Sequence, residues 1–189
     1  MVVGKTCPKV AQITTIKGDP VLQLPIPGQV TIIEFWATWC GPCRAVFPHI
    51  SALQQKYKTR GLVVVGLSME PDSPQLRDFV QRQGDKMQYT VACGEQASQS
   101  LASWANVGGI PFALVVDRQG TVVYAGHPAQ GLDTAVEKAM ALQPIVATQE
   151  ELSAMSSSEL KKILSTRGVG FADLLEKSEF VQRILERCT

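Results

Sequence analysis

The sequence predicts an α/β domain with a central mixed β-sheet flanked by helices, followed by a small all-α helix–turn–helix module. Three observations carry this prediction. Apolar runs of strand length alternate with amphipathic segments, the alternation ends in a hairpin pattern, and the C-terminal residues show only helical periodicity. Because the strands are apolar throughout, we expect helices to cover both faces of the sheet.

Short runs rich in β-branched residues predict the strands of the first domain. They are Val30–Trp36, Leu62–Leu67, Tyr89–Ala92, Phe112–Val116 and Thr121–Ala125. The turn residues 117–120 make the last two strands a hairpin. Helical spacing of apolar residues predicts the connecting helices, which are residues 44–57, a segment opened by Pro71–Pro74, Glu95–Trp104 and Leu132–Leu142.

The C-terminal part of the chain has a different pattern. The α/β domain is assigned to residues 1–143, a linker to 144–151 and the helical module to 152–189. A capping box at Ser156 and Glu159 predicts the first helix, Gly168 is its expected C-cap, and a second helix should start near Ser178. A module of this size buries little core alone, so we expect it to rest on the main domain or on a partner.

Composition narrows the classes of function. The 189 residues carry a net charge of +1 and are 45% hydrophobic, which suits a globular protein rather than one that coats nucleic acid or a membrane surface. Five cysteines are too few for a disulfide scaffold. No apolar run fits a signal peptide or a membrane span, so we expect a cytoplasmic location and no membrane partner. If a leader has been removed, the location is extracytoplasmic or organellar instead.

Two cysteines separated by two residues, Cys40 and Cys43, follow a predicted strand and open a predicted helix. The free N–H groups and the dipole of a helix N-terminus stabilise a thiolate, which favours Cys40 as the attacking sulfur. Cys43 lies one turn further in, where burial should raise its pKa, and it would resolve the mixed disulfide. A redox pair is therefore favoured over two structural thiols.

A half zinc site is the other alternative. A structural zinc ion needs four ligands, and the remaining candidates form no second pair; these are Cys7, Cys93, Cys188, His49 and His127. No metal is therefore expected. Among these five, Cys93 is a weaker candidate for a second redox thiol and His127 for a substrate contact.

The run from Glu34 to Arg44, which includes Trp39-Cys40-Gly41-Pro42-Cys43, resembles the active-site signature of thioredoxins. Pro48 resembles the family's helix-kinking proline, the Ile110–Pro111 pair its cis-proline segment, and Gly126 its groove glycine. The long segment between Leu67 and Gly109 is similar to the TlpA-like or ResA-like branch, many of whose members are extracytoplasmic reductases.

This resemblance implies a thioredoxin fold and a site for extended substrates. The residues it assigns to substrate binding are Trp39, Gly41, Pro42, Ile110, Pro111 and Gly126. The backbone of Ile110 would pair with the substrate, which tolerates many substrate sequences.

Glu34 stands where the family usually has a buried aspartate. A carboxyl in an apolar strand should have a raised pKa, which suits a proton acceptor for Cys43; a satisfied polar core residue is the alternative. The family's lysine that faces this acid matches Gly66 here, so Glu34 lacks that cation.

The expected function is that of a thiol–disulfide oxidoreductase, mainly a reductase, acting on protein disulfides and restored by an upstream dithiol. No nucleotide-binding glycine loop is present, so no cofactor beyond the cysteine pair is expected. A peroxidase is disfavoured, because the helix lacks the Pro-x-x-x-Thr-x-x-Cys arrangement of peroxiredoxins. A redox-linked adaptor or chaperone, with the tail as its docking module, is the alternative.

The tail resembles a SAP-like module, and in particular the C-terminal domain of the ARMET-type neurotrophic factors. That domain has its own Cys-x-x-Cys motif, which the matching residues 171–175 lack. SAP modules often bind DNA, yet residues 150–189 hold six basic and seven acidic side chains. A net charge of −1 argues against phosphate binding, so protein docking or simple stabilisation is favoured.

Overall fold

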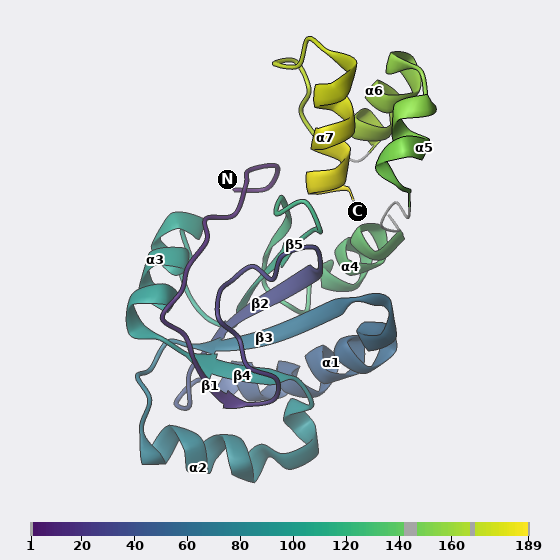
Figure 1. Ribbon diagram of the computed structural model, residues 1–189. Coiled ribbons are helices and arrows are strands. Elements are labelled where there is room, and N and C mark those ends of the chain that lie inside the picture. Colours follow the sequence, from purple (N-terminus) through teal and green to yellow (C-terminus); the bar gives the residue numbers. More distant parts are fainter. Residues whose placement is uncertain (1, 142–146, 167–168, 189) are drawn as a thin grey trace. The chain divides into compact units, whose positions relative to one another are not determined.

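The computed structural model describes residues 2–141, 147–166 and 169–188 (Figure 1). The chain divides after Met140 into two compact units. The first unit is built on one six-stranded sheet with the order β1-β4-β3-β2-β5-β6. Its strands are β1 Thr14–Lys17, β2 Val30–Trp36, β3 Leu62–Ser68, β4 Thr90–Cys93, β5 Phe112–Val116 and β6 Val122–Gly126.

The sheet is mixed, as the sequence predicts. The central strands β2, β3 and β4 run parallel, whereas β1, β5 and β6 are each antiparallel to their neighbour. Parallel neighbours need crossover helices, and these connections are α1 Gly41–Tyr57 and α2 Pro74–Gln83. Two more helices, α3 Glu95–Ala105 and α4 Leu132–Ala141, complete the unit, together with the short 3₁₀ turns η1 Lys58–Arg60 and η2 Gly84–Met87.

Strand β2 separates two apolar cores, and all seven of its residues are buried. Ile32 and Trp36 belong to the core that α1, α2 and α4 cover. Ile33 and Phe35 point to the other face, where they meet α3 and the N-terminal segment. Because side chains alternate along a strand, Glu34 must share the face of Ile32 and Trp36, which is the face under α1.

The sequence gives no signal for strand β1. Its residues, Thr14–Lys17, are partly polar and are mostly half-buried, so they form no apolar run. The strand exists because it pairs antiparallel with the edge of β4, with a register shift between Thr15 and Lys17. Only a long-range contact defines it, which a local pattern cannot show.

The described residues of the second unit form three helices rather than the two predicted. They are α5 Gln149–Ala154, α6 Ser157–Thr166 and α7 Lys177–Arg187. The assignment of 144–151 entirely to a linker is wrong at its C-terminal end, because Thr148 and Glu151 form a capping box that starts α5. Residues 144–146, the expected C-cap Gly168 and the predicted helix end at Leu142 lie outside the described residues.

The two predicted helix starts of the tail agree with the structure, and α7 begins at Lys177, one residue before the predicted Ser178. The capping box at the start of α6 is present: Ser156 N donates to Glu159 Oε2 at 2.8 Å and Glu159 N donates to Ser156 Oγ at 3.3 Å. The three helices share one small core, formed by Leu152, Leu160, Leu164, Phe180, Val181, Ile184 and Cys188. In neither unit does the structure describe a helix with both the length and the apolar character that crossing a membrane requires.

Candidate active site

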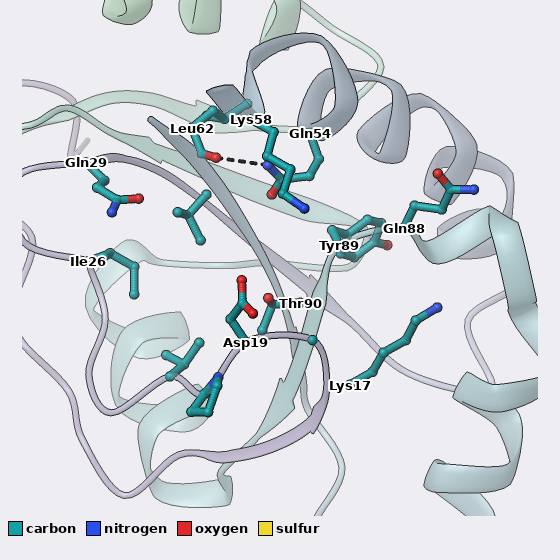
Figure 2. A pocket seen from close by; sticks show the side chains of 14 residues that line it. Lys17, Asp19, Ile26, Gln29, Gln54, Lys58, Leu62, Gln88, Tyr89 and Thr90 are labelled. Carbon is teal, nitrogen blue, oxygen red and sulfur yellow. Dashed lines mark hydrogen bonds between the residues drawn. The ribbon is translucent and has the colours of Figure 1, made fainter. Parts of the chain in front are cut away.

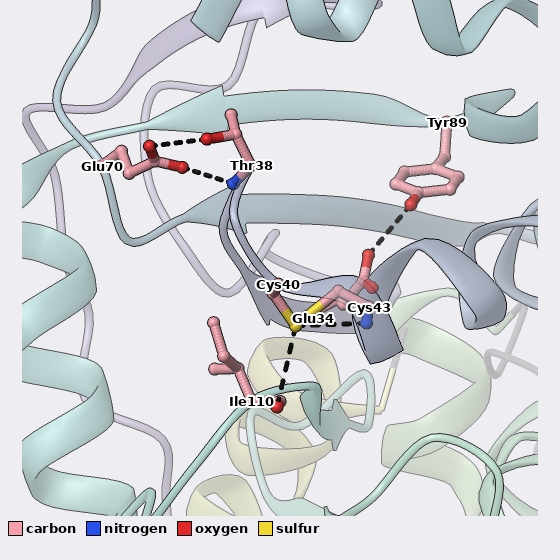
Figure 3. Close-up of a disulfide and its surroundings, with 7 residues drawn as sticks. All are labelled: Glu34, Thr38, Cys40, Cys43, Glu70, Tyr89 and Ile110. Atoms are coloured by element: carbon pink, nitrogen blue, oxygen red, sulfur yellow. Dashed lines mark hydrogen bonds between the residues drawn. A yellow bond between two sulfur atoms is a disulfide. The ribbon is translucent and has the colours of Figure 1, made fainter.

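The two cysteines of the predicted redox pair are joined by a disulfide where β2 leads into α1 (Figure 3). Cys40 is the N-cap residue of α1, and its sulfur accepts a hydrogen bond from the Cys43 amide at 3.1 Å. Pro42 occupies the first turn, where a missing N–H costs no helical hydrogen bond. Cys43 is fully buried, whereas Cys40 keeps 3% of its surface accessible, so Cys40 is the more accessible of the two.

A loop distant in sequence completes the surface around Cys40. The carbonyl oxygen of Ile110 lies 3.7 Å from the Cys40 sulfur (Figure 3). The Ile110–Pro111 peptide bond is cis. Trp39, next to Cys40, leaves 71% of its surface exposed. Gly126 ends β6 in register with Ala113 on β5, so it lies at the same edge of the sheet as Pro111.

Glu34 is completely buried, and one of its carboxyl oxygens has a partner. The Tyr89 hydroxyl donates to Glu34 Oε2 at 3.0 Å (Figure 3). Glu34 Oε1 and Trp36 Nε1 are buried without a hydrogen-bond partner among the described residues. Burial raises the pKa of Glu34 to about 8, although the Tyr89 hydrogen bond acts in the opposite direction. The carboxyl is thus poised to exchange a proton near neutral pH.

Gly66 explains how Tyr89 reaches Glu34. It lies opposite Glu34 in the parallel pair of β2 and β3. A Cβ at Gly66 would stand 2.9 Å from Tyr89 Cε2 and 3.2 Å from Trp36 Nε1. A side chain at position 66 would therefore displace the ring, and the glycine leaves room for a tyrosine from the next segment of chain.

Tyr89 is a site residue that the sequence pattern did not indicate. The pattern predicts a strand that starts at Tyr89, whereas β4 begins at Thr90. The contact depends on the pairing of β3 with β4 and on the space above Gly66, and neither is visible from local pattern. An aromatic hydroxyl at the start of a buried strand was the available signal, because such a hydroxyl needs a partner.

A second missed residue, Glu70, holds the loop that carries the cysteines. Its two carboxylate oxygens accept hydrogen bonds from the backbone N–H and from the hydroxyl of Thr38, the latter at 2.8 Å (Figure 3). Glu70 follows β3, so it fixes the loop after β2 to the neighbouring strand. Charge-assisted hydrogen bonds of this kind are among the stronger ones.

The weaker candidates have structural explanations. His49 Nε2 lies 2.8 Å from Asp133 Oδ2 and thereby links α1 to α4. The ring of His127 accepts a hydrogen bond from the Ala129 amide at 3.2 Å. Cys7 and Cys93 are buried outside the disulfide, and burial raises the pKa of each thiol, for Cys7 to about 11. Neither thiol is activated as a nucleophile.

Metal ligands do not gather in the described ranges. No three His, Cys, Asp or Glu side chains of residues 2–141, 147–166 and 169–188 are arranged to hold an ion.

One hollow lies away from the cysteines. It measures about 550 Å³ and is bordered by the N-terminal ends of the parallel strands (Figure 2). Cys40, by contrast, follows the C-terminal end of β2. Gln54 forms part of its wall. Its Nε2 donates a hydrogen bond to Leu62 O at 2.9 Å, and its Oε1 accepts one from Val64 N at 2.7 Å. Of the predicted and newly found site residues, Tyr89 alone borders it.

A second hollow adjoins the cysteines. It measures about 490 Å³ and is lined by Thr38, Trp39, Arg44, Gln75, Phe79, Arg82 and Gln83. Arg82 is paired with Asp78 at 2.6 Å. Trp39, the residue before Cys40, is 71% exposed and is part of its wall.

Comparison with known proteins gives consistent results. The family model described as Redoxin matches residues 3–141. The thiol-disulfide oxidoreductase ResA of Bacillus thuringiensis is 28% identical over 123 residues, which is 65% of this chain and 68% of the relative. The thiol:disulfide interchange protein DsbE of Allochromatium vinosum is 30% identical over 120 residues, covering 64% of this chain and 61% of the relative.

A solved structure shares the fold. The crystal structure described as a thiol:disulfide interchange protein DsbE from Chlorobium tepidum is 28% identical, with a TM-score of 0.61 over 71% of this chain and 95% of that one. The predicted thioredoxin fold of the first unit is thereby confirmed. Because the Redoxin model covers most of the chain and includes Cys40 and Cys43, this protein belongs to the Redoxin family.

Proposed function

We propose that this protein is a thiol–disulfide oxidoreductase that acts mainly as a disulfide reductase. The observation that carries the proposal is the Cys40–Cys43 disulfide at the N-terminus of α1, with Cys40 as the more accessible of the two cysteines. The amide of Cys43 and the helix dipole both favour negative charge on Cys40. Relatives named for thiol–disulfide exchange support the same class of reaction.

The reaction proceeds in two exchange steps. In the reduced protein the Cys40 thiolate attacks a substrate disulfide, a Cys40–substrate bond forms, and the other substrate sulfur leaves with the electron pair and takes a proton. Cys43 then loses its proton and attacks Cys40, so the Cys40–Cys43 bond forms and the second substrate sulfur leaves. Two electrons pass to the substrate, and an upstream dithiol must supply them again.

Glu34 serves in this proposal as the proton acceptor for Cys43. By alternation along β2 it shares the sheet face of Ile32 and Trp36, which lie in the same core as Cys43 of α1. Its pKa of about 8 leaves both protonation states accessible at neutral pH. Its unpartnered oxygen Oε1 is available to receive a proton.

The substrate lies, in this proposal, across the edge where three segments meet. Trp39, Gly41 and Pro42 border the disulfide on the α1 side. The Ile110 backbone, set by Pro111 and 3.7 Å from the Cys40 sulfur, would pair with an extended substrate segment. Gly126 at the end of β6 would leave room for that segment, because the glycine adds no side chain.

Replacing Cys43 with serine should trap substrates. The Cys40 thiolate can still attack a substrate disulfide, but without the second sulfur the mixed disulfide persists. We expect Cys43→Ser to retain covalently bound proteins that dithiothreitol releases and that mass spectrometry identifies.

The control for this trap is the double variant Cys40→Ser, Cys43→Ser. Like Cys43→Ser it cannot form the disulfide, but it also lacks the attacking sulfur. Cys93→Ser, at another buried cysteine, should trap nothing, because Cys43 remains. Equal capture by Cys43→Ser and the double variant would contradict the proposal.

We propose protein docking or stabilisation, rather than nucleic-acid binding, as the role of the second unit. Several of its basic groups already have internal partners. Arg183 pairs with Asp173 at 2.8 Å, Lys177 donates to Ser153 O at 2.6 Å, and Lys161 lies over the Phe180 ring. Its net charge of −1 does not favour phosphate either. The exposed Leu175, with 91% of its surface accessible, is a point where a protein partner could bind.

The full-length protein should accordingly show no salt-sensitive DNA binding. In a filter-binding assay at low ionic strength we expect no retention of duplex DNA at protein concentrations up to about 100 μM, the range of weak non-specific binding. Low-micromolar affinity that falls steeply with salt would overturn the docking role.

We further propose that the cysteine pair needs no cofactor and works in a reducing compartment, with the cytoplasm as the expected location. The disulfide itself carries the two electrons, and an external dithiol restores it. Trapping thiols with an alkylating agent in intact cells measures the redox state of Cys40 and Cys43. A predominantly reduced pair supports the proposed compartment, and a fully oxidised pair contradicts it.

A further inference from the structure

Glu34 is held by a single side-chain partner, and that partner comes from a segment far along the chain. The Tyr89 hydroxyl donates to Glu34 Oε2 at 3.0 Å, while Oε1 stays without a partner among the described residues. We propose that Tyr89 is a positioning residue for the resolving step: it fixes one oxygen of Glu34 and leaves the other to take the proton of Cys43. This inference rests on the disulfide-exchange function proposed above.

The packing around Gly66 leaves a space that the Tyr89 ring fills when its hydroxyl reaches Glu34. Tyr89 is 5% exposed and its ring fills the space above Gly66, where a Cβ would stand 2.9 Å from Tyr89 Cε2. Gly66 lies in the middle of β3, where glycine packs poorly and weakens a strand. A larger residue at position 66 would fill the core better but would remove the tyrosine from Glu34.

The surroundings of Glu34 leave the Tyr89 hydrogen bond as the interaction that favours its ionised form. Trp36, on the same face of β2, and Gly66, opposite on β3, carry no charge, and the core on this face of the sheet also contains Cys43 of α1. No described cation acts on the carboxyl, and the interaction that favours its ionised form comes from Tyr89. A donor hydrogen bond to a carboxylate in a dry site is stronger than one in water.

The step assigned to this pair is a balanced proton transfer followed by exchange. In the mixed disulfide, the Cys43 thiol gives its proton to the Glu34 carboxylate, whose other oxygen stays bonded to Tyr89. The Cys43 thiolate attacks Cys40, the Cys40–Cys43 bond forms, and the substrate sulfur leaves with the electron pair. Tyr89 itself neither gains nor loses a proton.

The test follows the two exchange steps separately in the full-length reduced protein. The chromogenic disulfide of thionitrobenzoate releases one anion when Cys40 attacks and a second when Cys43 resolves the mixed disulfide. In Tyr89→Phe we expect an unchanged first phase and a second phase whose pH profile moves up by about one unit, so that resolution at pH 7 slows about tenfold. The direction follows because the lost hydrogen bond favoured the carboxylate.

Three further variants make the result decisive. Tyr57→Phe removes a hydroxyl from another buried tyrosine, in the last turn of α1, and should leave both phases unchanged. Glu34→Gln should remove the titration from the second phase. Gly66→Ala keeps the tyrosine but forces its ring to move, so its second phase should shift in the same direction as that of Tyr89→Phe.

Each outcome decides the question. A second phase of Tyr89→Phe that matches the wild-type profile, while Glu34→Gln loses the titration, overturns the role of Tyr89 and leaves the proton role of Glu34 in place. If Glu34→Gln also matches the wild type, the proton role itself fails. If Tyr89→Phe does not fold, as judged by its first phase, Gly66→Ala decides in the same way.

Discussion

Replacing Cys40 with serine is expected to abolish disulfide reduction, with a loss in kcat/KM of about a thousandfold or more. Serine is close to cysteine in size, and position 40 is nearly buried, so the fold should persist. The hydroxyl is not ionised at neutral pH even with the Cys43 amide and the helix dipole beside it, so no nucleophile remains. Turbidity from insulin reduction by dithiothreitol measures the loss.

The matched control is Cys93→Ser, which changes a cysteine that is buried on β4 and outside the disulfide. It should reduce insulin at the wild-type rate within about twofold, because its thiol takes no part in exchange. A Cys40→Ser variant with a tenth or more of the wild-type activity would disprove the assignment of the nucleophile. Retained client binding by an inactive Cys40→Ser would favour the adaptor alternative for that binding.

The second large effect concerns stability and comes from the burial of Glu34. Its pKa is about 8 in the folded, oxidised protein and near 4.5 when the chain unfolds. Between these values the native state binds more protons than the unfolded state, so the free energy of unfolding falls as the pH rises. Between pH 5 and pH 8 the free energy of unfolding falls by a total on the order of 4 kcal/mol. Below the pKa of the unfolded state, Glu34 adds no pH dependence, because it is protonated in both states.

Glu34→Gln should remove this dependence. The new amide N–H₂ group costs stability at every pH, because it is buried, so the expected result is a difference in slope rather than in absolute stability. Guanidinium unfolding at pH 5, 6.5 and 8 measures it. Fluorescence reports on the first unit alone, because Trp36, Trp39 and Trp104 all lie there.

Glu137→Gln is the control for this titration, because Glu137 is 57% exposed and pairs only with Lys56 at 3.2 Å. Its unfolding free energy should follow the wild type within about 0.5 kcal/mol at each pH. Parallel pH dependences for wild type and Glu34→Gln would show that the buried carboxyl is not the source.

The parts of the fold that could be predicted from the sequence are those fixed by local pattern. Val30–Trp36 is an uninterrupted apolar strand and keeps its predicted bounds, because every residue of it is buried. The spacing of Cys40 and Cys43 after that strand predicts a redox pair if a helix starts there, and α1 does start at this point. Local sequence and tertiary structure agree here, as expected for a consistent fold.

The missed features depend on contacts between distant segments. Glu70, in the segment after β3, binds Thr38, and Tyr89 reaches Glu34 only because Gly66 has no side chain. Strand β1 is defined by its pairing with β4. The short helix α5 is different: its capping box at Thr148 was visible in the sequence, but six residues are too few for apolar periodicity.

The double hydrogen bond from Thr38 to Glu70 has a consequence for recognition. It fixes the residues just before Cys40 through contacts made within the folded chain itself. The loss of conformational entropy in this loop therefore accompanies folding and does not weaken substrate association. A preorganised loop can present one sulfur to unrelated polypeptides, since shape adaptation is left to the flexible partner.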